Sequence, residues 1–310
     1  MVTNSLIKVE DIAFVRFRAP DLGEMDGFLR DFGFPERRTE NGRLYARGTG
    51  PAPFLHVTEA GEAGFGGVGL RATSMDDLHV LAKAEGAEVR QLDAPGGGLV
   101  VTLADPDGHL VEVVAGQAVA PELALPQRPP WNAAADRPRR RQTKRTGEGA
   151  HVVRLGHCVL NVSNFRASER WWKERFGFIT SDEIALTPEF SLGAFLRCDR
   201  GEVATDHHTL FLMQSPKGPG FNHAAFEVAD LDDLMAGHDR LKAAGRTQEW
   251  GVGRHVLGSQ VFDYWRDPWG HTLEHWTDGD LFTAADPSNT ATLQDLLAVQ
   301  WGPSPPPTMG

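Results

Sequence analysis

The chain contains an internal repeat, and this repeat constrains the fold more than any other feature of the sequence. The segments Gly64–Leu78 (GFGGVGLRATSMDDL) and Gly220–Leu234 (GFNHAAFEVADLDDL) each combine an alternating apolar strand, a polar turn and an Asp-rich helix start. Further along, Leu103–Val113 (LADPDGHLVEV) matches Trp265–His275 (WRDPWGHTLEH) in the same order and at nearly the same separation. Two matches in one order indicate a duplicated domain.

Each half of the chain divides again into two similar units. In the second half, the alternating strand Leu155–Val162 precedes a helix at Asn164–Phe176, which ends at Gly177. In the first half, Ile12–Ala19 precedes a helix at Leu22–Phe32 in the same way. The sequence therefore predicts an α+β fold made of four strand–helix–strands units, which pair into two domains.

Composition divides the chain into an N-terminal domain, a linker, a C-terminal domain and a tail, at residues 1–116, 117–150, 151–282 and 283–310. The linker holds five prolines, which is typical of an extended tether. Its basic run Arg137–Arg145 is more typical of a solvated tether than of a nucleic-acid site on an acidic chain. The tail has a predicted helix at Ala291–Val299 and a Pro-rich end, and the sequence leaves open whether it covers the active site or serves assembly.

Charge and cysteine content exclude several classes of protein. The net charge of −11 argues against nucleic acid or an anionic membrane as the main partner. No apolar run approaches the length of a membrane span, and the N-terminus does not resemble a signal peptide. The only two cysteines, Cys158 and Cys198, form no CxxC pair. We therefore expect a cytoplasmic protein.

Two strands each place one histidine on the face that points away from the following helix. Alternation in Leu155–Val162 puts His157 and Asn161 on one face and apolar side chains on the other. The strand Phe221–Val228 has the same parity and presents His223 in the same way. A single strand histidine is more often a hydrogen-bonded core residue, so the inference depends on the equivalence of the two positions.

A carboxylate joins the two histidines after the last predicted hairpin. Asp267–Gly270 (DPWG) is a strong turn signal, and the returning strand presents Glu274 on the face that also carries Thr272 and Trp276. Two histidines and one carboxylate facing one cavity form a facial metal set with open positions for substrate and dioxygen. We therefore expect His157, His223 and Glu274 to bind a divalent metal, Fe(II) or alternatively Mn(II).

The N-terminal half does not repeat this set. By the same pairing, His157 corresponds to Phe14, or to Ala13 with a shift of one residue, and His223 corresponds to Gly67. Only Glu112 remains opposite Glu274. One carboxylate does not hold a catalytic metal, so we expect the N-terminal domain to be a metal-free scaffold in which Glu112 is a surface or salt-bridged residue.

At this point the sequence resembles the type I extradiol dioxygenases of the vicinal oxygen chelate superfamily. The segment Gly253–Glu274 (GRHVLGSQVFDYWRDPWGHTLE) is similar to that family's signature, Gly-x-His, seven residues, then x-Tyr-x-x-Asp-Pro-x-Gly-x-x-x-Glu. Asp263 departs from it, because an apolar residue usually precedes the tyrosine. The resemblance implies four βαβββ modules paired into two tandem domains. Each domain would be a curved mixed β-sheet that partly encloses a cavity, with helices outside.

The resemblance also implies further site residues. The family's acid–base histidine matches His207 or His208. The spacing to His223 favours His208, and alternation would send His207 to the opposite face. The family's substrate-side pair matches His255 and Tyr264. Independently of the resemblance, the aromatic residues Phe190 and Trp250 are candidates for lining an apolar substrate pocket. Arg254 is a candidate for selecting a substrate carboxylate, although an arginine at such a position is more often a surface residue.

These residues together predict an enzyme that uses a non-haem Fe(II) centre and O2 to cleave a catechol-type ring beside its two hydroxyl groups. A hydroquinone-type dioxygenase or another vicinal oxygen chelate enzyme, such as a glyoxalase-like isomerase, is the alternative function. A non-catalytic small-molecule binding protein is disfavoured by the metal set. The expected partners are a small aromatic diol and O2, and homo-oligomers are common in the family.

Overall fold

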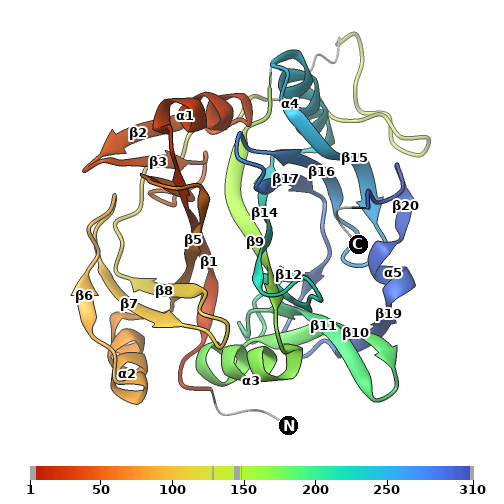
Figure 1. Ribbon diagram of the computed structural model, residues 1–310. Coiled ribbons are helices and arrows are strands. Elements are labelled where there is room, and N and C mark those ends of the chain that lie inside the picture. The colour runs from red at the N-terminus through yellow and green to blue at the C-terminus, as the bar shows by residue number, and fades with distance from the viewer. Residues whose placement is uncertain (1–4, 128, 143–146, 148, 308–310) are drawn as a thin grey trace.

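The protein folds into two sheets that stand side by side (Figure 1). The computed structural model describes residues 5–127, 129–142, 147 and 149–307. Within these residues the first sheet has eight strands and the second has ten, and a third, small sheet has two. The strands β1 and β5 of the first sheet lie next to β9 and β14 of the second, at the middle of the molecule.

The first sheet is built from two βαβββ modules. Its strands lie in the order β2-β3-β4-β1-β5-β8-β7-β6, so the first strands of the two modules are central neighbours. The elements are β1 (Val9–Ala19), α1 (Leu22–Asp31), β2 (Glu36–Glu40), β3 (Arg43–Arg47), β4 (His56–Ala60), β5 (Gly64–Ala72), α2 (Met75–Glu85), β6 (Val89–Gln91), β7 (Leu99–Ala104) and β8 (Leu110–Ala115).

The second sheet repeats this plan and adds two strands from the tail. Its order is β19-β10-β11-β13-β9-β14-β17-β16-β15-β20. The modules comprise β9 (Val152–Val162), α3 (Phe165–Phe176), β10 (Ile179–Thr187), β11 (Phe190–Arg197), β12 (Thr205–Asp206), β13 (Leu210–Gln214), β14 (Gly220–Val228), α4 (Leu231–Ala243), β15 (Thr247–His255), β16 (Val261–Arg266) and β17 (Thr272–Thr277). The predicted α+β fold of four βαβββ modules is confirmed.

Local sequence signals place the helices that cover the outer faces of the sheets. Asn164 caps α3 by accepting a hydrogen bond from the backbone of Ala167, and Gly177 ends the helix with a φ of 74°. In α2, the side chains of Ser74 and Asp77 form a capping box, and Gly86 ends the helix with a φ of 64°. Each helix therefore begins and ends at a fixed point above its sheet.

The tail is part of the second sheet rather than a separate segment. Its strand β19 (Asn289–Thr292) pairs with β10 at one edge, and β20 (Val299–Trp301) pairs with β15 at the other. Between them, α5 (Leu293–Leu297) is shorter than the helix predicted from the sequence. A further short strand, β18 (Leu281–Phe282), pairs with β12. The tail thus supplies both edge strands of the sheet that carries the predicted metal ligands.

The linker begins along the first domain. The backbone amides of Ala118, Ala120 and Leu123 each donate a hydrogen bond to a carbonyl oxygen in loops of the N-terminal domain. Part of the predicted basic run, residues 143–145, lies outside the described residues.

The two sheets are joined by a buried carboxylate and a shared core. Asp31, at the end of α1, is 3% exposed and accepts hydrogen bonds from Arg240 and Arg246 of the second domain. His275 Nε2 donates to the backbone oxygen of Phe32 over 2.6 Å. One hydrophobic cluster contains residues of both halves. This interface fixes β17, which carries Glu274 and His275, against the first domain.

Within the described ranges, no helix has the length and apolar character needed to cross a membrane.

Candidate metal centre

Three neighbouring strands bring the two predicted histidine ligands and the glutamate together. Strand β14 lies between β9 and β17, and its Ala225 is paired with His157 on one side and with Glu274 on the other. His157 Nε2 lies 3.3 Å from Glu274 Oε2, and His223 Nε2 lies 3.4 Å from the same oxygen. One potential ligand atom from each residue falls within 4.8 Å of the others. We call the sheet face that carries these three residues the inner face.

Glu274 is a buried carboxylate that a cation would satisfy. Its side chain is completely buried, neither carboxylate oxygen has a hydrogen-bond partner of ordinary geometry among the described residues, and the neighbouring Tyr264 hydroxyl lowers its pKa only in part. Burial therefore raises the pKa of Glu274 well above its ordinary value, since an isolated buried carboxylate is strongly unfavourable. A divalent cation between the three side chains would compensate this charge. The donor set thus fits a metal of the Fe(II) or Mn(II) type.

Both histidines are in the state that a metal requires. Burial lowers the pKa of His157 well below its ordinary value and lowers the pKa of His223 to about 3, so both rings are neutral. His223 Nδ1 lies 2.8 Å from Asn222 Oδ1, which orients the ring and leaves Nε2 free to face Glu274. Asn222 was not singled out from the sequence.

The equivalent place in the first domain is filled by aromatic side chains. Phe14 is paired with Gly69 of the neighbouring strand, just as His157 is paired with Ala225. Phe14, and not Ala13, is therefore the residue that corresponds to His157. The Phe14 ring packs on Phe54 with centroids 4.7 Å apart. Glu112 forms an ion pair with Arg16 over 2.8 Å, as the sequence predicts for a salt-bridged residue.

The His208 ring contacts the candidate ligand His157 on one side and His207 on the other. The ring centroids of His208 and His157 are 3.9 Å apart. The expectation that His207 points to the opposite face is wrong, because residues 207–209 lie between β12 and β13 and do not continue a regular strand. Instead, His207 Nδ1 lies 3.0 Å from His208 Nδ1, and the two histidines form one buried group.

His255 and Tyr264 form a second pair on the other side of the ligands. His255 Nε2 and the Tyr264 hydroxyl are 3.0 Å apart, and the Tyr264 ring is 5.2 Å from that of His223. Burial raises the pKa of Tyr264 and lowers the pKa of His255 to about 3, so both groups are neutral. Trp250 is 5% exposed and its ring lies 5.5 Å from Tyr264, so it supports the pair.

The structure gives the surroundings of two of the predicted substrate contacts, Arg254 and Phe190. Arg254 donates hydrogen bonds to Ser259 and Asp278 and lies over the ring of Trp301, so its guanidinium is engaged by these residues. Phe190 begins β11 after a hairpin turn and is 43% exposed.

Asp263, the residue that departs from the family signature, faces the helix α4 rather than the inner face. Its carboxylate contacts His238 Nδ1 at 3.1 Å and accepts a hydrogen bond from Trp265 Nε1 at 2.5 Å. The departure from the signature therefore changes the packing under the helix and leaves the wall around the ligands unchanged.

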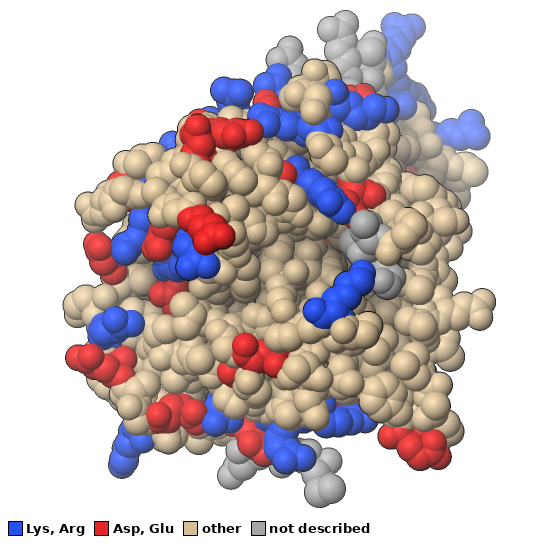
Figure 2. Space-filling view, viewed as in Figure 1, with Lys and Arg blue, Asp and Glu red and all other residues tan. Residues whose placement is uncertain are grey.

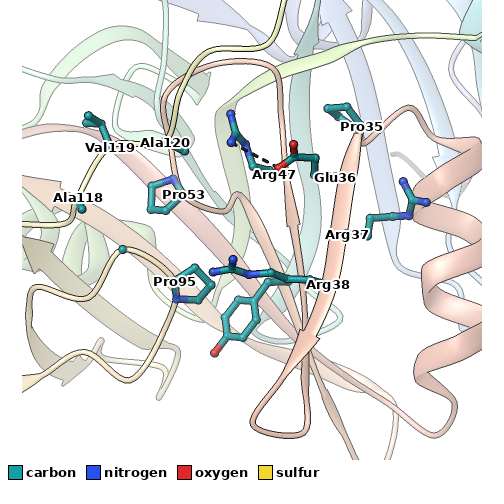
Figure 3. A pocket seen from close by; sticks show the side chains of 12 residues that line it. Pro35, Glu36, Arg37, Arg38, Arg47, Pro53, Pro95, Ala118, Val119 and Ala120 are labelled. Carbon is teal, nitrogen blue, oxygen red and sulfur yellow. Dashed lines mark ion pairs between the residues drawn. The ribbon is translucent and has the colours of Figure 1, made fainter.

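A separate pocket lies in the first domain and not at the metal ligands. Figure 3 shows its lining, which includes Arg38, Arg47 and residues of the linker. Arg47 forms an ion pair with Glu36 over 3.5 Å and donates a hydrogen bond to the Pro121 backbone. These contacts hold the linker against the domain. Over the face seen in Figure 2, acidic and basic side chains are interspersed around the margin.

The chain was compared with known proteins. Residues 154–275 match the family model described as the Glyoxalase/Bleomycin resistance protein/Dioxygenase superfamily. Over 301 residues, 96% of this chain and 90% of the relative, it is 30% identical to Metapyrocatechase 2 of Cupriavidus necator. A Mn(II)-bound glyoxalase from Novosphingobium aromaticivorans superposes with a TM-score of 0.78 at 25% identity, covering 98% of this chain and 95% of that one. An extradiol ring-cleaving dioxygenase from B. fuscum gives a TM-score of 0.79 at 19% identity, covering 99% and 82%; it supports the shared fold alone.

Proposed function

Because this chain belongs to the glyoxalase/bleomycin resistance protein/dioxygenase superfamily, we propose that it is an extradiol dioxygenase that cleaves a catechol-type ring and incorporates both atoms of O2. The observation that carries the proposal is the unpartnered, fully buried carboxylate of Glu274 between two neutral histidines. His157, His223 and Glu274 would hold Fe(II), with Mn(II) as the alternative. When bound, the metal supplies adjacent coordination positions for the diol and O2.

The neighbouring side chains supply the proton chemistry. The Tyr264 hydroxyl and His255 Nε2 are neutral and 3.0 Å apart, so they can hydrogen-bond and orient the substrate hydroxyl groups. His208, whose ring lies against His157, can accept a proton from one hydroxyl group and return it when the ring opens. Tyr264 and His208 are buried and His255 is half-buried, so bulk water has little access to these groups.

An apolar cluster beside the ligands supports an aromatic substrate. Val159 follows His157 by two residues on the same face of β9, and it packs with Ile184, Phe195 and Phe211. Such a surface stabilises a ring by burying its apolar area. The cluster favours a catechol with an apolar substituent over a dihydroxy acid.

The test is a panel of catechols, hydroquinones and dihydroxy acids, given to protein that was reconstituted with Fe(II) without oxygen. We expect O2 consumption and a coloured ring-fission product with substituted catechols. Protein reconstituted in the same way after His223→Ala is the control, and it should give neither signal. Ring fission by the His223→Ala protein at the wild-type rate would contradict the assignment.

The likeness to the Mn(II)-bound glyoxalase favours one second candidate, a metal-dependent isomerase. An isomerase consumes no O2, so a glyoxalase assay of the same metal-loaded protein under nitrogen separates the two functions. Product formation there, with no ring fission in air, would favour the isomerase. Failure to bind metal at all would favour a non-catalytic binding protein.

We also propose a cytoplasmic location, supported by two free, buried cysteine thiols. We propose in addition that the protein is a homo-oligomer. Light scattering of the metal-loaded protein would measure its mass in solution.

A further inference from the structure

Behind His208 lies a chain of hydrogen bonds that ends on a carboxylate. His208 Nδ1 lies 3.0 Å from His207 Nδ1, and His207 Nε2 lies 2.5 Å from Asp182 Oδ2. The other oxygen of Asp182, Oδ1, accepts a hydrogen bond from Asn289 Nδ2 over 2.8 Å. The first three side chains are buried, with exposed fractions of 5%, 1% and 7% for His208, His207 and Asp182.

The direction of each hydrogen bond follows from the carboxylate at the end of the chain. Hydrogen bonds from His207 and Asn289 lower the pKa of Asp182, although burial alone would raise it, so this group is ionised and accepts only. His207 Nε2 must then carry a hydrogen. Where His207 is a neutral ring, its Nδ1 is the acceptor, and His208 Nδ1 donates to it. This leaves His208 Nε2 without a hydrogen.

Hydrogen bonds to the backbone and a neighbouring aromatic ring hold the side chains of His208, His207 and Asp182 in one arrangement. The His207 backbone oxygen accepts a hydrogen bond from Ser181 Oγ over 2.6 Å, and its amide donates to the Asp280 oxygen over 3.0 Å. The Phe195 ring lies 5.1 Å from the His207 ring and 4.8 Å from the His208 ring. Asn289 reaches Asp182 because β19 of the tail pairs with β10 at these two residues.

We propose that Asp182, His207 and Asn289 are positioning residues that fix the tautomer of His208, so that its Nε2 is left free to accept a proton. The consequence for catalysis rests on the proposed function, whereas the tautomer itself does not. The tail segment thereby acquires a role, because its Asn289 holds the Asp182 carboxylate in the orientation in which it faces His207. Asp182 therefore acts on His208 through His207, without contacting the substrate itself.

Asp182→Asn should reverse the tautomer without changing the shape of the site. Asn289 Nδ2 would still hold the oxygen of the new amide, so the amide nitrogen would face His207 and donate to Nε2. His207 would then carry its hydrogen on Nδ1 and donate to His208 Nδ1, which moves the hydrogen of His208 to Nε2. The double variant Asp182→Asn/Asn289→Asp is the matched control. Its carboxylate at position 289 would accept from the amide nitrogen and turn the amide oxygen back toward His207.

The experiment measures the tautomer and the kinetics separately. Nitrogen NMR of histidine-labelled protein loaded with Zn(II), a diamagnetic ion that accepts His and carboxylate ligands, reports which nitrogen of His208 carries the hydrogen. We expect Nδ1 in the wild type, Nε2 in Asp182→Asn and Nδ1 again in the double variant. With Fe(II), kcat for a catechol should fall by about a hundredfold or more in Asp182→Asn, as for loss of a positioned base, and recover in the double variant. Iron content and anaerobic catechol affinity should stay unchanged.

The same hydrogen position on His208 in all three proteins would overturn the proposal, and so would Nε2–H in the wild type. If Asp182→Asn does not fold, His207→Phe replaces it, and retention of a single Nδ1–H tautomer there would equally overturn the proposal. The expected tautomers without any ring cleavage by the wild type would remove the proposed function but leave the positioning role intact.

Discussion

Replacing Glu274 by glutamine should stabilise the metal-free protein at neutral pH while abolishing its response to metal. Glu274 is completely buried without a hydrogen-bond partner among the described residues, and burial raises its pKa well above the ordinary 4.5. The folded metal-free protein therefore keeps a proton that the unfolded chain releases. A pKa raised in this way makes the free energy of unfolding decrease as pH rises above 4.5.

The size of this change in the free energy of unfolding follows from the pH range over which only the folded protein keeps the proton of Glu274. Each pH unit at which the folded carboxyl keeps its proton costs about 1.4 kcal/mol of stability, so at pH 7 the cost reaches up to about 3 kcal/mol. Glutamine has the same shape and no such cost. Metal at a hundredfold excess over its Kd should stabilise the wild type by about 2.7 kcal/mol. It should not stabilise Glu274→Gln.

The assay is urea denaturation of both proteins from pH 4.5 to 7.5, first with chelator and then with Mn(II), which is stable in air. With chelator, the two proteins should have similar stability at pH 4.5, and the variant should be the more stable at pH 7. A variant that is less stable than the wild type at pH 7 would show that Glu274 has a structural partner. An equal increase of stability with Mn(II) in both proteins would show that the metal binds elsewhere.

Three other perturbations have defined outcomes. His208→Gln should keep its iron content but lower kcat by about a hundredfold to ten-thousandfold, as loss of an acid–base group does; iron analysis with steady-state kinetics checks this, and an unchanged kcat would contradict the role. Asp31→Ala leaves Arg240 and Arg246 without their shared carboxylate and should lower the free energy of unfolding by about 1.5–3 kcal/mol. Glu40→Ala, which removes an exposed ion pair with Arg38, is its control and should change it by less than about 1 kcal/mol; equal losses would refute the interface role. Burial lowers the pKa of His56 to about 3 from the ordinary 6.5, so the folded protein takes up that proton less readily than the unfolded chain. The free energy of unfolding should therefore fall by about 1.4 kcal/mol for each pH unit between 6.5 and 3 because of His56. Denaturation at several pH values should show a smaller fall in the free energy of unfolding at low pH for His56→Gln than for the wild type.

The sequence predicts the ligand set because its signals are local and duplicated. Alternation within β9 and β14 decides which face His157 and His223 occupy, and the DPWG turn does the same for Glu274. The repeat then makes the three positions equivalent, so their convergence needs no knowledge of distant contacts. The same comparison identifies Phe14 as the residue that occupies the corresponding place in the first domain.

The sequence fails where regular structure ends. His207 was expected to face away because alternation was extended through residues 207–209, which are not in a strand. Asp182 carries no motif, and its hydrogen bond to Asn289 spans 107 residues. Such a contact depends on the pairing of β10 with β19, for which the sequence holds no local signal.

The central claim is ring opening beside a diol, with both oxygen atoms of O2 entering the product. The most direct measurement is mass spectrometry of the product formed from an alkyl-substituted catechol under ¹⁸O₂ by Fe(II)-loaded protein, with borohydride added at once to trap the carbonyl oxygen. We expect two labelled oxygen atoms in a single ring-opened product whose carbon skeleton was cut next to the diol. Cleavage between the two hydroxyl-bearing carbons, a product with no label, or an unopened ring would contradict the account.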